Sequence, residues 1–337
     1  MSGSVLVTGA NGSLAQPMVT HLLTTYPAYT PILTVRDASP SDPNTASLRS
    51  ILSRFPNSKA SIHELDLSSL ASVHSFASSL ASDIAAGKYP PLAAIICNAY
   101  TWNLVSPRPD PTVDGYDETV QVIHVSHAAL VMRLLGSFRR PGEEEAGREG
   151  GRVVMISSDS HYPGKNPMEV YPPTLGDDLD LLVHPPPLAD GDDDVVGKGY
   201  QRYANGKLAL TTWGLALGGW LEKHAPHISS LLIDAGNFPS SRALTRNTPR
   251  SMHAFQEEMM RKPMAELLAL NPTVRTTEDG ARDVVKLALN DRFRGVRSGF
   301  YSRLERGESS PESRDEGVQG RLWEATMRWT GVEGMEG

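Results

Sequence analysis

Short apolar runs alternate with amphipathic stretches along most of this chain. The runs have the length of strands and span residues 5–7, 31–35, 61–65, 92–97, 153–156, 228–234 and 299–301. Between them, apolar residues recur at helical spacing over residues 18–23, 46–55, 70–84, 115–139 and 277–290. The run at 92–97 is apolar at every position, as expected for a strand that is buried on both faces. This alternation predicts an α/β fold with a parallel sheet between helices.

A glycine-containing turn, residues 8–15, follows the first apolar run and opens a helical pattern. Gly9 and Gly12 would let the backbone approach a phosphate, and the free N–H groups of the following helix would face it. A structural turn is the alternative interpretation. The glycine turn directly follows the first strand of a chain in which strands and helices alternate, and this position favours nucleotide binding.

Arg36 directly follows the second predicted strand. In a dinucleotide-binding fold this position lies beside the adenosine ribose, where an arginine accepts a 2′-phosphate and an acid bonds the 2′-hydroxyl. Arg36 therefore favours NADPH over NADH, with a solvated pair of Arg36 and Asp37 as the alternative. Asp66 and Leu67, at the end of the third strand, are placed to meet an adenine ring.

A phenol and an ammonium stand one helical turn apart at Tyr203 and Lys207, where a long apolar stretch begins. A fixed positive charge favours phenolate, so we expect a lowered pKa of Tyr203 and acid–base chemistry near neutral pH. Ser157 and Ser158 end the fifth strand, at the edge of the sheet where such folds bind ligands.

Residues 159–202 break the alternation with prolines and with acids at Asp177, Asp178, Asp180 and 190–194. The acids could hold a divalent cation, but the absence of a ligand-loop pattern favours a solvated insertion. Apolar residues at 179–183 predict that one part packs down, as a flap. His124 and His127 lack a nearby third ligand, so we expect packed or exposed histidines and no metal site.

The composition narrows the function classes. The net charge of −7 argues against a nucleic-acid partner, which requires a basic face. The single cysteine, Cys97, excludes an internal disulfide and fits a reducing compartment. With no secretory segment at the start and no apolar run long enough for a membrane span, we expect a cytoplasmic protein.

The second half of the chain offers a substrate region and a closing helix. The helix at 208–221 is apolar nearly all round, which predicts burial within the domain or against a second subunit. Residues 239–271 carry several methionines and Phe255, which could line a pocket for a bulky apolar substrate or pack in the core. We divide the chain into a domain at 1–306 and a polar linker with a C-terminal helix at 307–337.

Taken in order, these motifs resemble those of the short-chain dehydrogenase/reductase family, whose members have a single doubly wound Rossmann domain. The resemblance runs from about residue 5 to residue 301 and includes Asn98-Ala99 after the fourth strand and Ala235-Gly236 after the sixth. The short segments Ser68-Ser69-Leu70 and Leu322-Trp323-Glu324 further resemble the branch of the family that contains retinol-dehydrogenase-like and fungal secondary-metabolism reductases.

The resemblance implies a role for most of these residues. Its catalytic residues would be Ser158, which bonds the substrate oxygen, Tyr203, which passes a proton, and Lys207, which lowers the pKa of the tyrosine and holds the nicotinamide ribose. The cofactor, NADPH or NADP⁺, would contact Thr8, Gly9, Asn11, Gly12, Ser13, Leu14, Arg36, Asp66, Leu67, Asn98, Ala99, Tyr203, Lys207, Ala235 and Gly236. The substrate would contact Tyr100, Ser158, Tyr203 and Phe238.

The first hypothesis is therefore NADPH-dependent reduction of a ketone or aldehyde on a bulky apolar small molecule. A homodimer is implied by the helix at 208–221, which resembles the one that dimers of the family use. Ile123 stands where the family has a proton-relay asparagine, and Tyr100 and Ala235 replace a glycine and a proline. These departures motivate a second hypothesis, a reductase-derived protein that binds cofactor but performs a non-redox reaction or acts as a binding protein.

Overall fold

An eight-stranded sheet forms the centre of the computed structural model, which describes residues 3–140, 150–188 and 193–332. The strand order is β3-β2-β1-β4-β5-β6-β7-β8. All described pairs are parallel except β7 with β8. The strands are β1 (Ser4–Val7), β2 (Thr30–Val35), β3 (Ser61–Glu64), β4 (Leu92–Cys97), β5 (Gly151–Ile156), β6 (Ile228–Asp234), β7 (Ser298–Ser302) and β8 (Glu305–Gly307). The predicted doubly wound α/β fold is confirmed.

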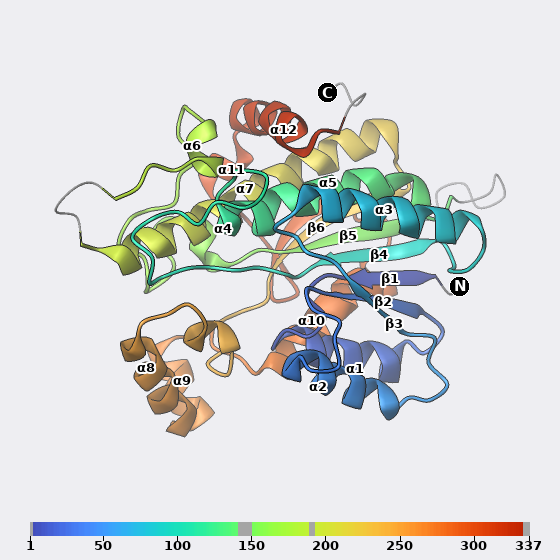
Figure 1. Ribbon diagram of the computed structural model, residues 1–337, viewed down its shortest axis with the longest axis horizontal. Coiled ribbons are helices and arrows are strands. Elements are labelled where there is room, and N and C mark those ends of the chain that lie inside the picture. Colours follow the sequence, from blue (N-terminus) through green and yellow to red (C-terminus); the bar gives the residue numbers. More distant parts are fainter. Residues whose placement is uncertain (1–2, 141–149, 189–192, 333–337) are drawn as a thin grey trace.

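Helices cover both faces of this sheet (Figure 1). One face carries α1 (Ala15–Thr25), α2 (Pro43–Ser53) and α10 (Thr277–Leu289). The other carries α3 (Leu70–Ala85), α5 (Ser126–Leu134), α7 (Val195–His224) and α12 (Glu316–Thr330). In Figure 1, α8 (Arg250–Arg261) and α9 (Met264–Leu270) stand apart from both layers.

Each face of the sheet has its own apolar core, which explains why the strands are apolar throughout. Val5 and Val7 of β1 point into the cluster under α1 and α10, while Leu6 between them joins the cluster under α3, α5 and α7. Side chains of successive strand residues alternate between faces, so a strand covered on both sides needs apolar residues at every position.

The long helix predicted at 115–139 is shorter and irregular. It comprises α4 (Glu118–Val120), the π-helical η1 (Gln121–Val125), α5 and the 3₁₀ turn η2 (Leu135–Ser137). It begins after Asp117 because this carboxylate accepts a hydrogen bond from the Val120 N–H at 3.1 Å and caps the helix. Within the described residues this is the one helix long and apolar enough to cross a membrane, but 89% of its most apolar window is buried inside the protein.

The predicted insertion at 159–202 ends earlier than expected. Helix α7 begins at Val195, where the Asp194 carboxylate accepts from the Gly197 N–H at 2.8 Å, so residues 195–202 belong to the helix that carries Tyr203. Part of the remainder packs down as predicted, because Leu182 of the short α6 (Asp180–Val183) is buried. Residues 190–192 of the acidic run lie outside the described residues.

The stretch expected to be a polar linker instead completes the domain. It forms β8 and α11 (Pro311–Arg314), and the serines at 309, 310 and 313 are buried. The Ser310 N–H donates to the His161 imidazole at 3.1 Å, which explains how a polar segment can be buried there.

Helix α12 then covers α7 within the same chain. Trp323 of α12 stacks on two tryptophans of α7, with ring centroids 6.2 Å from Trp213 and 5.9 Å from Trp220. The apolar surface of α7 is therefore buried to a large extent without a second subunit, and the homodimer stays a prediction.

Candidate active site

A cavity of about 960 Å³ lies at the carboxyl edge of the sheet, where the strand order reverses between β1 and β4. Open α/β sheets bind ligands at such a switch point. Of the predicted site residues, only Thr8 lies outside its walls. The predicted residues that line it are Gly9, Asn11, Gly12, Ser13, Leu14, Arg36, Asp66, Leu67, Asn98, Ala99, Tyr100, Ser158, Tyr203, Lys207, Ala235, Gly236 and Phe238.

Thr8 lies behind the cavity wall and joins β1 to β4. Its hydroxyl oxygen accepts hydrogen bonds from the backbone N–H groups of Asn98 at 2.9 Å and Ala99 at 3.1 Å. The Asn98 amide in turn donates to the Thr8 carbonyl at 2.8 Å. Gly9 has φ +61°, and a Cβ at this position would lie 3.0 Å from that of Ala99. Glycine is needed here for both its conformation and its size.

A buried histidine completes this support. His127 Nδ1 lies 2.9 Å from the Ile123 carbonyl oxygen and its Nε2 lies 2.9 Å from the Thr8 hydroxyl. Because Nδ1 must donate to the carbonyl, Nε2 of the neutral ring accepts from Thr8. Burial lowers the pKa of His127 to about 4, which keeps it neutral. The sequence predicted a packed or exposed histidine but gave no sign of this contact, which joins residues far apart in the chain.

Ser158, Tyr203 and Lys207, the predicted catalytic residues, line the same cavity. Ser158 caps the 3₁₀ turn η4 (Asp159–His161) directly after β5, while Tyr203 and Lys207 occupy successive turns of α7. Lys207 Nζ lies 5.9 Å from the centroid of the Tyr203 ring and donates to the Ile156 carbonyl at 2.7 Å. The arrangement brings a hydroxyl, a phenol and an ammonium to one wall.

The expected lowering of the pKa of Tyr203 is wrong for this structure. Burial raises the pKa of the phenol, and the nearby hydroxyls of Ser158 and Ser160 offset only part of that rise. Burial also lowers the pKa of Lys207 to about 7, although the Asp234 carboxylate acts against it. The lysine therefore carries only part of a charge at neutral pH, and its hydrogen bond goes to a carbonyl.

Aromatic rings surround Tyr203. The ring centroids of Tyr100 and Trp102 lie 5.7 and 5.2 Å from that of Tyr203, and the Tyr200 centroid lies at 5.8 Å. Tyr100, which replaces a family glycine, therefore contacts the proposed acid–base group. Trp102 and Tyr200 also line the cavity, and neither was among the predicted site residues. This wall is suited to a substrate with apolar or flat groups.

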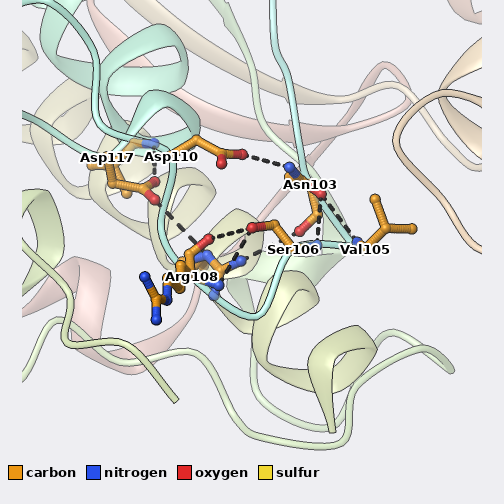
Figure 2. A network of polar contacts seen from close by, with 8 residues as sticks. Asn103, Val105, Ser106, Arg108, Asp110 and Asp117 are labelled. Carbon is orange, nitrogen blue, oxygen red and sulfur yellow. Dashed lines mark hydrogen bonds and ion pairs between the residues drawn. The ribbon is translucent and has the colours of Figure 1, made fainter. Parts of the chain in front are cut away.

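A polar network holds the segment after β4 against α7 (Figure 2). The Asn103 amide donates to the Asp110 carboxylate at 2.5 Å and shapes the turn between them. Arg202, next to Tyr203 in α7, lies 3.8 Å from the Asp117 carboxylate and donates to the Asn103 carbonyl at 3.4 Å. These contacts fix the aromatic wall relative to the helix that carries Tyr203.

The predicted substrate loop, 239–271, closes another side of the cavity. It begins with the 3₁₀ turn η5 (Arg242–Thr245) and continues into α8 and α9. Apolar residues of this loop line the cavity, among them Phe255, Met259, Leu267 and Leu270. Helix α8 has no fully buried residue, although Met252 is half-buried and packs against the apolar core, so this loop contributes both to the cavity and to core packing.

No group of three or more histidine, cysteine, aspartate or glutamate side chains suited to a metal ion occurs in the part of the chain that the structure describes. His124 is instead buried beside Thr326 of α12, with its Nε2 2.8 Å from the hydroxyl. The packing interpretation of the two histidines therefore holds.

The fold and the cavity define a doubly wound α/β protein with a nucleotide-type site at the edge of its sheet. A family model described as the AcuH dehydrogenase domain matches residues 242–337. The short-chain dehydrogenase iccH of Talaromyces variabilis is 28% identical over 98% of this chain and 96% of its own length. The polyprenol dehydrogenase of Mus musculus is 30% identical over 85% of this chain and 72% of its own length.

Solved structures agree on the fold. An NADPH-bound carbonyl reductase from chicken fatty liver has a TM-score of 0.56 at 18% identity and covers 91% of this chain and 99% of its own. Levodione reductase has a TM-score of 0.57 at 16% identity, covering 89% of this chain and 95% of its own. The chain belongs to the short-chain dehydrogenase/reductase family, and it is an NAD(P)-dependent oxidoreductase of that family.

Proposed function

We propose that this protein reduces a ketone or aldehyde on a bulky apolar substrate with NADPH. The observation that carries the proposal is that Ser158, Tyr203 and Lys207 line the same cavity as the glycine turn and Arg36. A proton donor, an oxygen-binding hydroxyl and a phosphate-binding turn are the parts that such a reaction needs from the protein.

The residues around the turn fit a nicotinamide dinucleotide. A Cβ at Gly12 would lie 3.0 Å from the Gly9 carbonyl oxygen, so the close turn itself needs glycine at this position. Asn11 is held to α2, since its amide donates to the Thr45 hydroxyl at 3.0 Å. Arg36 would hold the 2′-phosphate of NADPH, and Asp66 and its neighbour Leu67 would contact the adenine.

When bound, the reduced nicotinamide supplies a hydride to the carbonyl carbon. The protein's own part is to hold the substrate oxygen and to protonate it. Since burial raises the pKa of Tyr203, the phenol is protonated at neutral pH and is suited to donate to a developing alkoxide. The Ser158 hydroxyl would stabilise the same oxygen, and Lys207 would hold the nicotinamide ribose.

The walls of the cavity support an apolar substrate. Trp102, Phe238 and Phe255 come from three separate segments and line the same space as Met259 and Leu270. A relative named as a polyprenol dehydrogenase adds support for a large apolar substrate. We therefore propose a carbonyl group on a large hydrophobic molecule.

The test is NADPH oxidation, followed by absorbance, across a panel of apolar aldehydes and ketones of increasing size. We expect turnover that Tyr203→Phe lowers by at least about a thousandfold, because the proton donor is lost. Tyr26→Phe, at the end of α1, is the matched control and should retain wild-type turnover. Full activity of Tyr203→Phe would refute the proposed mechanism.

A second candidate, the cofactor-binding protein without redox activity, rests on Ile123. Its side chain is completely buried at the position of the family's relay asparagine, and its carbonyl is bonded to His127. Tight NADPH binding without oxidation by any member of the panel would favour this candidate over a reductase.

A further inference from the structure

Two arginines enter the cavity from the loop that follows β6. Arg242 and Arg246 line the same cavity as Arg36, although only Arg36 belongs to the cofactor positions that the sequence indicates. Among the described residues, none of the three guanidinium groups forms an ion pair with a carboxylate. Three such cations around one cavity repel one another, and a bound anion would remove that repulsion.

Arg242 lies on the glycine turn. Its backbone N–H donates to the Ser13 hydroxyl at 3.0 Å, and its Nε donates to the same oxygen at 3.3 Å. Its terminal nitrogen also donates to the Asn11 carbonyl. The guanidinium therefore sits beside the backbone that would receive a pyrophosphate, and its planar fork is suited to phosphate oxygens.

Arg246 lies in the field of Arg36. Burial lowers the pKa of Arg246, and the charge of Arg36 is the next cause of the lowering. Glu118 acts in the opposite direction, but it forms no ion pair with Arg246 within the described residues. Arg36 and Arg246 line one cavity and their charges interact, and guanidinium groups placed in this way are suited to bind a phosphate dianion.

The loop that carries both arginines is fixed to the aromatic wall. The Trp102 indole N–H donates to the carbonyls of Ala243 at 3.0 Å and Arg246 at 3.2 Å. The Leu104 N–H donates to the Asn247 carbonyl at 2.8 Å. Between Trp102 and Leu104 lies Asn103, the centre of the network in Figure 2, so the loop is anchored next to α7.

We propose that Arg242, Arg246 and Arg36 together bind the phosphate groups of the dinucleotide. Arg242 binds the pyrophosphate, and Arg246 shares the 2′-phosphate with Arg36. This inference rests on the proposed function, because it assumes a nicotinamide dinucleotide in the cavity. It adds that the substrate loop itself selects NADPH, which couples the choice of cofactor to the position of the wall at Trp102.

The test is equilibrium binding by calorimetry of NADPH, NADH, 2′,5′-ADP and 5′-ADP to the full chain. Arg246→Ala should weaken NADPH and 2′,5′-ADP by about 10- to 100-fold and leave NADH and 5′-ADP unchanged, as expected for one lost charged hydrogen-bond donor. Arg242→Ala should weaken NADPH, NADH and 5′-ADP, which carry a pyrophosphate, to a similar degree, and should weaken 2′,5′-ADP less, because this ligand has only a 5′-monophosphate beside its 2′-phosphate. Arg250→Ala, an exposed arginine at the start of α8, is the control for a general charge effect.

A double-mutant cycle sharpens the assignment of the 2′-phosphate. If Arg36 and Arg246 share the 2′-phosphate, the losses of binding free energy for 2′,5′-ADP in the two single variants do not add up to the loss in the double variant. For Arg36 and Arg242 the losses in the single variants should add up. Higher salt should weaken 2′,5′-ADP binding less in the variants than in the wild type.

Each outcome decides between the two proposals. Wild-type affinity of both loop variants for NADPH and 2′,5′-ADP would overturn the shared site while the proposed function stands. Equal losses in Arg246→Ala and Arg250→Ala would also overturn it, because the effect would then be one of net charge. If the wild-type protein bound neither NADPH nor NADH, both the site and the proposed function would fall.

Discussion

Replacing Lys207 by methionine should stabilise the protein while it abolishes turnover. Lys207 is 3% exposed, and burial lowers its pKa from 10.5 to about 7. The gap between these values corresponds to a cost of about 5 kcal/mol for burying the charged form. Methionine has a similar length and carries no charge, so Lys207→Met removes this cost.

Lys207→Met also removes the hydrogen bond that Lys207 donates to the Ile156 carbonyl at 2.7 Å, and this loss offsets part of the increase in the free energy of unfolding. An unsatisfied buried carbonyl costs about 1–3 kcal/mol. The net stabilisation expected at pH 6 is therefore about 3 kcal/mol. The protein accepts this loss of stability because the proposed reaction needs an amine beside Tyr203.

The stability difference between Lys207→Met and the wild type should decrease as the pH rises. Below pH 7 the lysine is charged in both the folded and the unfolded states, so the whole cost is present. Between pH 7 and 10.5 the folded state releases its proton while the unfolded state keeps it, so wild-type stability rises with pH. The advantage of Lys207→Met should therefore shrink by about 3 kcal/mol between pH 6 and pH 9.

Urea unfolding followed by tryptophan fluorescence at pH 6 and pH 9 measures both quantities. Lys59→Met is the control, because Lys59 is exposed in the loop before β3 and should show no difference at either pH. A Lys207→Met protein that is less stable than the wild type at pH 6 would refute the argument. A stability difference that is the same at both pH values would refute it as well.

Two further predictions concern the supports of the site. His127→Leu leaves the Thr8 hydroxyl without its imidazole acceptor, which should cost about 1–3 kcal/mol in urea unfolding at pH 7 and weaken NADPH binding. Because the pKa of His127 is lowered to about 4 from 6.5, the wild type should lose about 3 kcal/mol more than His127→Leu as the pH falls from 7 to 4, and equal losses would contradict this. Trp323→Ala removes the stack on Trp213 and Trp220 and should cost about 3–5 kcal/mol, whereas a change below 1 kcal/mol in urea unfolding would show that α12 is not needed to cover α7.

The sequence predicted the strands that are buried on both faces of the sheet, because every residue of such a strand has an apolar environment. Strands covered on both faces must be apolar at every position, so β1 and β4 are visible as short runs without any knowledge of their partners. In a parallel sheet the carboxyl ends of the strands meet at one edge. Ser158 and the glycine turn therefore had to lie near each other once the order of strands was recognised.

Contacts that join distant segments were not predictable in the same way. The serines at 309, 310 and 313 were assigned to a polar linker, yet a hydrogen bond from the Ser310 N–H to His161 helps to bury them. Arg242 and Arg246 occupy a short 3₁₀ turn and the residue after it, where no periodic pattern marks their direction. The sign of the pKa shift of Tyr203 depends on how deeply the finished cavity buries both partners, which residue spacing does not give.

Ile123 shows how the local structure redirects the proton path to Tyr203. A Cβ at Gly206 of α7 would lie 3.2 Å from the Ile123 side chain, so the two helices meet here in close apolar contact. The Ile123 carbonyl, on the π-helical turn, accepts from His127 and not from a group that leads to the cavity. The space that a relay asparagine would open towards Lys207 is thus filled. The hydroxyls of Ser158 and Ser160 lie beside the phenol, and Ser158 donates to the Asp159 carboxylate at 3.2 Å. The η4 side of the cavity therefore offers hydrogen-bonding groups from which Tyr203 could be reprotonated, whereas Ile123 offers none on the side of α5.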